Sequence, residues 1–180
     1  AYADRSEAFC MLNDQAIAAQ WLLDNGKANK ILILDLDVHQ GNGTAAIFSN
    51  HEKVFTFSMH GEKNYPFRKE KSDWDIALAD QTDDATYLKI LTDSLDDLYQ
   101  NVQPDFVFYL CGVDVIAQDK LGRLGLSVLG CKQRDEMVLQ WCRRHALPVQ
   151  CSMGGGYVPE ISVLVEAHAN TFRLAQDIYF

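Results

Sequence analysis

The chain has 180 residues, a length that predicts one domain with a substantial buried core. Hydrophobic residues make up 48% of it and charged residues 23%, as in ordinary globular domains. The net charge of −9 argues against a face that binds nucleic acid or an anionic membrane, because such faces are built from clustered lysine and arginine. We therefore expect no nucleic-acid partner and no membrane association, while the oligomeric state stays open.

The chain contains five cysteines without a CxxC pair, and an odd number does not suit a disulfide framework. This pattern favours a reducing, cytoplasmic setting. The opening residues AYADRSEAFC show no onset of a helix or strand. We therefore expect residues 1–180 to be the C-terminal portion of a longer domain.

The predicted elements alternate between helix and strand. Asn13 can cap a first helix that ends near Gly26, and the apolar run ILILDLD predicts a strand over 31–37. A short helix over 43–49 and a strand over 54–59 follow, and residues 60–82, which lack periodicity, are expected to form a long loop. Helices are then expected over 84–102, 127–145 and 160–176, and strands over 105–112 and 147–153.

This alternation predicts an α/β fold with a mostly parallel sheet. Polar residues or glycines follow each of the four expected strands. Ligands bind at the carboxyl ends of strands in such sheets, so these residues are expected to converge on one crevice. They are Asp35, Asp37 and His39, then Ser58 and His60, then Asp114, and finally Gly154, Gly155, Gly156 and Tyr157.

Asp37 and His39 are two positions apart, so in an extended segment their side chains lie on the same side. A carboxylate and an imidazole placed in this way form half of a zinc site, and Asp114 at another strand end is positioned to complete it. Such a site keeps an open position for water. The alternative is that Asp37 caps the next helix and His39 binds backbone.

A second interpretation comes from GNGTAA, residues 41–46, which fits the dinucleotide-binding pattern G-x-G-x-x-A, with Glu62 about 20 residues further on. This interpretation would make the protein a nucleotide-binding oxidoreductase. Asp35 and Asp37, however, would place negative charge beside the pyrophosphate, which argues against this interpretation.

The motif SMGGGY, residues 152–157, ends the last expected strand. Gly155 and Gly156 would let the backbone approach a substrate closely, and the Tyr157 hydroxyl could donate to a developing oxyanion. The alternative is a flexible turn followed by a core tyrosine.

Five motifs together resemble the zinc-dependent histone deacetylases, in particular bacterial class IV-like members. They are DRSEAFCMLND, ILDLDVHQGNGT, FTFSMHGEKNYPF, GVDVIAQDKLGRLGLS and SMGGGY, in the order seen in that family. The resemblance implies the three-layer α/β/α arginase/deacetylase fold, incomplete at its N-terminus here. It also implies hydrolytic removal of acyl groups from acyl-lysine or related acylated amines.

The resemblance assigns roles to individual residues. It implies that Asp37, His39 and Asp114 bind zinc and that Tyr157 polarises the substrate carbonyl. It also implies aromatic walls for a substrate tunnel and a structural potassium ion. The walls would be Phe9 and Phe67, and the potassium ligands would be Asp35, Asp37, His39, Ser58 and Met59.

The chain also departs from the family pattern. The paired histidines that transfer protons in the family would stand just before Ala1, and no His-His pair occurs in these residues. We therefore expect the 180 residues alone to be inactive. Asn42 stands where many members have an aspartate that orients one of those histidines, a mild change because other members have asparagine there. Gln40 and Gln118 replace a histidine and a glycine common in the family, which puts local loop shape in question more than metal binding. A non-catalytic metal- or partner-binding domain of the same fold is a further alternative, and the substrate and the choice between zinc and iron(II) stay open.

Overall fold

The computed structural model describes residues 1–180 and contains one sheet of five strands in the order β3-β2-β1-β4-β5. All four strand pairings are parallel, so the sheet is entirely parallel where the sequence predicted a mostly parallel one. The strands are β1 (Ile31–Asp35), β2 (Val54–Gly61), β3 (Trp74–Leu78), β4 (Phe106–Leu110) and β5 (Val149–Ser152).

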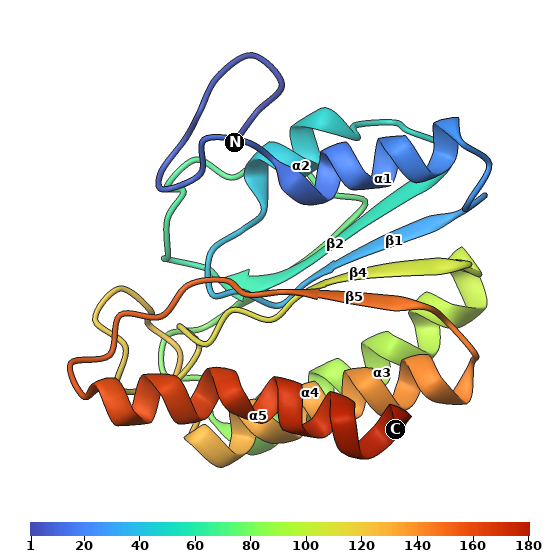
Figure 1. Ribbon diagram of the computed structural model, residues 1–180. Helices are drawn as coiled ribbons and strands as arrows, with labels where there is room; N and C mark the ends of the chain where they lie inside the picture. Colours follow the sequence, from blue (N-terminus) through green and yellow to red (C-terminus); the bar gives the residue numbers. More distant parts are fainter.

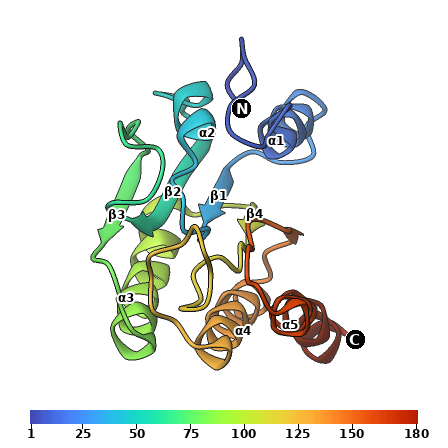
Figure 2. The same ribbon diagram turned by 90° about the vertical axis from the view of Figure 1, so that its left-hand side faces the viewer.

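Helices cover both faces of this sheet. Helices α1 (Asp14–Asp24) and α2 (Asn42–Ile47) lie on one face, and α3 (Asp84–Val102), α4 (Val128–Arg144) and α5 (Ile161–Tyr179) lie on the other (Figures 1 and 2). The predicted three-layer α/β/α architecture is confirmed. None of these helices is long and apolar enough to cross a bilayer.

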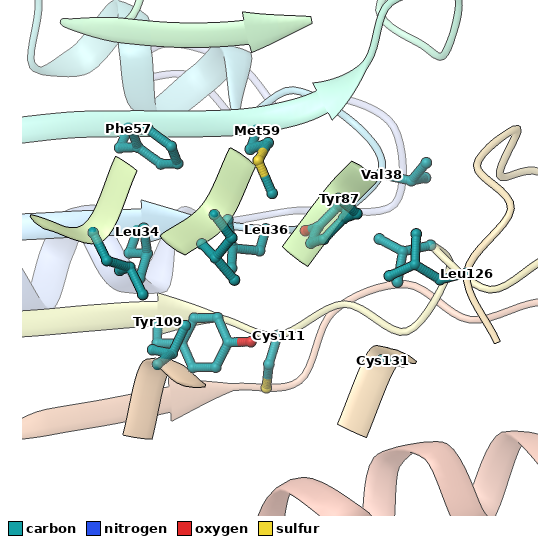
Figure 3. Close-up of a cluster of buried hydrophobic side chains, with 14 of the residues drawn as sticks. Leu34, Leu36, Val38, Phe57, Met59, Tyr87, Tyr109, Cys111, Leu126 and Cys131 are labelled. Atoms are coloured by element: carbon teal, nitrogen blue, oxygen red, sulfur yellow. The ribbon is translucent and has the colours of Figure 1, made fainter. Parts of the chain in front are cut away.

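The central strand β1 shows why the fold is layered. All five of its residues are buried, as expected for a parallel strand with helices on both sides. Alternate residues point to opposite faces, so Leu32 and Leu34 join the core beneath α3–α5, whereas Ile31 and Ile33 join the core beneath α1 and α2. Figure 3 shows Leu34 and Leu36 among the side chains of the larger core, together with Phe57 and Tyr109 from the neighbouring strands.

Side-chain caps mark the starts of α1 and α4, and the cap at Asn13 was predicted from the sequence. The Asn13 side chain accepts a hydrogen bond from the backbone of Ala16 at the start of α1, and Ser127 caps α4 in the same way. The prediction of an unstructured loop over 60–82 was wrong, because it contains β3. This strand is five residues long, lies at the sheet edge and is mostly half-exposed, so it lacks the apolar run that marks the central strands.

The order of the strands creates a switch point at β1. From β1 the chain proceeds through α2 to β2 on one side and, after β3 and α3, returns to β4 on the other side. At such a point the connections leave in opposite directions, which opens a crevice at the carboxyl ends of the strands. Asp37 and His39 follow β1 there, and Asp114 follows β4.

Candidate metal centre

Asp37, His39 and Asp114 meet at this switch point, as predicted from the spacing of the first two and from the place of Asp114 at another strand end. One potential ligand atom from each of the three side chains lies within 4.8 Å of the others. His39 Nδ1 is 3.0 Å from Asp37 Oδ1 and 3.1 Å from Asp114 Oδ2. The two aspartates are buried and His39 is half-buried, so the imidazole is the part of the cluster that reaches the surface.

Backbone amides orient both carboxylates. The amide of Gly155 donates to Asp37 Oδ2 at 2.9 Å, and the amide of Val38 donates to Asp114 Oδ1 at 2.9 Å. These contacts link the loops after β1, β4 and β5 into one unit. Partners of this kind fix the direction of metal ligands in proteins.

The buried carboxylates of the cluster favour a positive charge beside them. Burial raises the pKa of Asp114 to about 7, and burial together with the nearby Asp37 raises the pKa of Asp35 well above its usual range. Burial acts to lower the pKa of His39, but hydrogen bonds to Asp114 and Asp37 outweigh it and raise this pKa to about 10. The raised pKa values mean that Asp35, Asp114 and His39 retain protons, which compensate the buried negative charge as a bound cation would.

The donor set fits a divalent transition metal. Imidazole nitrogen and carboxylate oxygen both bind zinc at about 2.1 Å, which places tetrahedral ligands roughly 3.4 Å apart. The 3.0 and 3.1 Å separations around His39 Nδ1 are close to this value. The alternative that Asp37 caps the following helix was wrong, because α2 begins after Gly41 and its N-cap has no side-chain hydrogen bond.

The dinucleotide pattern does not form an anion site in this structure. A Cβ atom placed on Gly41, at the start of α2, would lie 2.3 Å from Asp35 Oδ2. The carboxylate of Asp35 therefore lies against the turn that a pyrophosphate would have to approach. Negative charge at this position opposes phosphate binding.

Two of the three glycines of SMGGGY pack against the carboxylates of Asp37 and Asp114. A Cβ atom on Gly155 would lie 1.9 Å from Asp114 Oδ2, and one on Gly154 would lie 2.6 Å from Asp37 Oδ2. Gly156 instead faces Leu164 and Val113. The carboxylates of Asp37 and Asp114 account for Gly154 and Gly155, while substrate contact by Gly155 and Gly156 stays a prediction.

Tyr157 and Phe9 lie side by side at the surface. Their ring centroids are 5.7 Å apart, and the two side chains are 41% and 80% exposed. The alternative of a core tyrosine was therefore wrong. Phe67 is also exposed and packs against Tyr65, with ring centroids 6.2 Å apart.

The residues that the resemblance assigns to potassium lie at the ends of β1 and β2. Asp35 is the register partner of Ser58, and the Asp37 amide donates to Asp35 Oδ1 at 3.1 Å. The Ser58 hydroxyl bonds His60 Nδ1 at 3.0 Å, and the Met59 side chain belongs to the larger core. The Met59 side chain packs in the core, so only the backbone carbonyl of Met59 is suited to bind a potassium ion.

Two residues near the site were not identified as site residues from the sequence. Gln40, next to His39, is buried and bonds both the backbone carbonyl and the amide of Glu70, at 2.8 and 2.9 Å. It thereby anchors the loop that carries Phe67. Asp119 is buried and accepts the Tyr157 amide. Its only sequence signal is its place in the polar loop that follows Asp114.

A parallel sheet covered by helices on both faces, with an Asp-His-Asp cluster at its switch point, defines a three-layer α/β/α protein that carries a candidate metal site at the carboxyl edge of its strands. The model of the Histone deacetylase domain matches residues 1–172. The chain belongs to the histone deacetylase domain family.

Related proteins agree with this assignment. An uncharacterized protein of Picosynechococcus sp. is 46% identical over 179 residues, which cover 99% of this chain and 60% of that protein. Histone deacetylase 2 of Arabidopsis thaliana is 30% identical over 159 residues, 87% of this chain and 41% of that protein. The chain therefore spans between two fifths and three fifths of the length of these relatives.

The fold has a counterpart of known structure. The crystal structure of an acetylpolyamine aminohydrolase from Burkholderia pseudomallei superposes with a TM-score of 0.83 at 24% identity, covering 99% of this chain and 53% of that one. At this identity the likeness concerns the fold, and it confirms the arginase/deacetylase architecture.

Proposed function

We propose that the protein is a zinc-dependent amidohydrolase that removes acyl groups, acetyl above all, from lysine side chains or related amines. The observation that carries the proposal is the cluster of the buried Asp37 and Asp114 with the half-buried His39, whose potential ligand atoms lie within 4.8 Å of one another. Membership of the histone deacetylase family supports the reaction class.

In this proposal each residue has a distinct task. Asp37, His39 and Asp114 hold the metal, which when bound polarises a carbonyl and lowers the pKa of water. The Tyr157 hydroxyl donates a hydrogen bond to the substrate carbonyl oxygen as negative charge develops there. Phe9, whose ring lies beside Tyr157, and Phe67 enclose the aliphatic stem of the acylated amine, and the backbone at Gly155 and Gly156 borders it.

The buried acidic residues also favour the binding of a second cation. Asp35 and Asp37 are both buried, and one metal at Asp37 leaves the charge of Asp35 uncompensated. We assign a structural potassium ion to Asp35, Asp37, His39, Ser58 and Met59, the last of these through its backbone. Monovalent charge at this place would hold the loop between β1 and His39 in shape.

The substrate class is an acylated amine, on a protein or on a small molecule. The net charge of −9 disfavours the approach of acidic substrates. The five free cysteines suit a cytoplasmic location. No adjacent histidine pair occurs in residues 1–180, so we propose that proton transfer to the leaving amine requires residues outside them.

The test uses the protein expressed from its complete coding sequence. Asp37→Ala and His39→Ala should each abolish stoichiometric zinc binding and hydrolysis of an acetyl-lysine peptide. His51→Ala, on the segment between α2 and β2, is the matched control and should retain both. Full activity in either ligand variant would refute the proposal, and zinc binding without turnover by the unmodified protein would favour a non-catalytic metal-binding domain.

A further inference from the structure

A buried ion pair lies behind the metal cluster, on α4. Arg134 and its neighbour Asp135 have no exposed side-chain surface, and Arg134 Nε donates to Asp135 Oδ1 at 2.8 Å. A second guanidinium nitrogen, Nη2, lies 2.8 Å from the same oxygen. Because desolvation offsets the attraction in such pairs, a buried pair adds little stability compared with well-packed apolar residues. The buried ion pair therefore requires an explanation other than its contribution to stability.

The third guanidinium nitrogen, Nη1, contacts the two backbone segments that lead from β1 and β4 to the proposed metal ligands. Arg134 Nη1 donates to the carbonyl of Leu36 at 3.1 Å and to that of Gly112 at 2.6 Å. Leu36 directly precedes Asp37, and Gly112 stands two residues before Asp114. One side chain thus joins the backbone on both sides of the metal cluster.

The sheet itself does not set this spacing. The register between β1 and β4 ends at the pair Asp35 and Leu110, before either ligand is reached. Beyond that pair two further contacts join the segments: the Leu36 amide donates to the Leu110 carbonyl at 3.1 Å, and the Val38 amide donates to Asp114 Oδ1 at 2.9 Å. Arg134 adds a side-chain bridge between these two contacts, on the backbone that leads into Asp37 and Asp114.

Asp135 fixes the direction of the guanidinium. Its carboxylate accepts hydrogen bonds from the Tyr109 hydroxyl at 2.5 Å and from the Thr171 hydroxyl at 2.6 Å. Tyr109 belongs to β4 and Thr171 to α5, so the pair is anchored from two further elements. Charged hydrogen bonds of this kind are stronger and more directional than neutral ones.

We infer that Arg134, held by Asp135, is a positioning residue that sets the separation of Asp37 and Asp114 and thereby the zinc affinity of the cluster. This inference rests on the proposed metal site and concerns how tightly that site binds. Lysine cannot replace Arg134, because a single ammonium group lacks the planar fork that serves Asp135 and two carbonyls together.

The experiment measures zinc affinity and stability separately. The protein from the complete coding sequence is stripped of metal. The zinc Kd is then determined by competition with a chromophoric chelator, and the Tm of the zinc-free form by circular dichroism. Arg134→Lys should raise the zinc Kd by about 10- to 100-fold, the range known for residues that orient metal ligands. Arg144→Lys, near the exposed end of the same helix, is the matched control and should leave the Kd unchanged.

A milder variant keeps the test decisive if Arg134→Lys does not fold. Thr171→Val removes one anchor of Asp135 while Arg134 stays in place, and it should raise the zinc Kd by a smaller factor. An unchanged zinc Kd in folded Arg134→Lys, or in Thr171→Val where the former is unfolded, would overturn the inference even if the Tm falls. If the unmodified protein binds no zinc, the proposed metal site fails first, and the inference fails with it.

Discussion

The backbone amide of Tyr157 donates a hydrogen bond to Asp119 Oδ2 at 2.5 Å. The other carboxylate oxygen of Asp119 accepts the amides of Leu121 and Gly122, both at 2.8 Å. Asp119 is only 8% exposed, whereas the Tyr157 side chain reaches the surface. A buried aspartate in the loop after Asp114 therefore determines where the exposed tyrosine stands relative to the metal cluster.

Replacing Asp119 by Asn should lower kcat for an acetyl-lysine peptide by about 10- to 100-fold, since small displacements of a catalytic group have effects of this size. An amide group cannot accept hydrogen bonds on both sides, so the Tyr157 backbone would shift. Zinc affinity should stay unchanged, because Asp119 does not contact the three ligands.

The double variant Asp119→Asn with Tyr157→Phe provides the internal check. If Asp119 acts through Tyr157, the double variant loses no more activity than Tyr157→Phe alone. Additive losses would contradict this relationship. The exposed Asp177→Asn serves as the control for the loss of one carboxylate.

Gly155→Ala should disrupt the metal cluster directly. The added methyl group would lie 1.9 Å from Asp114 Oδ2 and 2.7 Å from its Cγ, so the carboxylate or the loop has to move. We expect the zinc Kd to rise by about tenfold or more. The free energy of unfolding should fall by about 1–3 kcal/mol.

Gly26→Ala is the matched control for this substitution. Gly26 has a φ of +61° and no atom within 4 Å of an added Cβ. Alanine there should cost about 1–2 kcal/mol through backbone strain alone and leave the zinc Kd unchanged. Equal zinc affinities in the two variants would show that the space beside Asp114 is not critical.

The 180 residues expressed alone should show no turnover of an acetyl-lysine peptide, whereas the complete coding sequence should support it. The reason is that the proposed reaction needs a proton donor for the leaving amine, and these residues contain no histidine pair. Both forms are assayed with zinc at equal concentrations of folded protein. Zinc-dependent turnover by the shorter form would show that its own side chains suffice.

Stability should fall in mildly alkaline solution because of the buried thiols. Burial raises the pKa of Cys111 and Cys142 to about 12 and that of Cys131 and Cys151 to about 11. In the unfolded chain these thiols ionise near pH 8.5. The unfolded state therefore releases protons first, and the stabilisation present below that pH is lost as the pH rises toward 11. Each thiol contributes a slope of up to about 1.4 kcal/mol per pH unit.

Urea unfolding at pH 8 and pH 10, in the presence of a chelator, measures this slope. Cys142→Ala should make it shallower, because one buried thiol no longer ionises on unfolding. Cys10→Ala, at an exposed position, should leave it unchanged. Identical slopes in the two variants would contradict the assignment.

Local patterns predicted the parts of the molecule that depend on neighbours in the chain. The apolar run before Asp35 predicted a strand buried on both faces, and Asn13 predicted the start of α1. The spacing of Asp37 and His39 predicted that both would face one side. In each case the responsible contacts lie within a few residues, so the periodicity of the sequence carries the information.

Long-range packing decided the rest. Arg134 and Asp135 lie in a stretch of α4 rich in polar residues, which by pattern alone would face solvent, yet both are fully buried. Their partners are 22 to 98 residues away in the chain. Local periodicity cannot specify such partners, because burial of a charge becomes tolerable only once the fold brings carbonyls, hydroxyls and an opposite charge together around it.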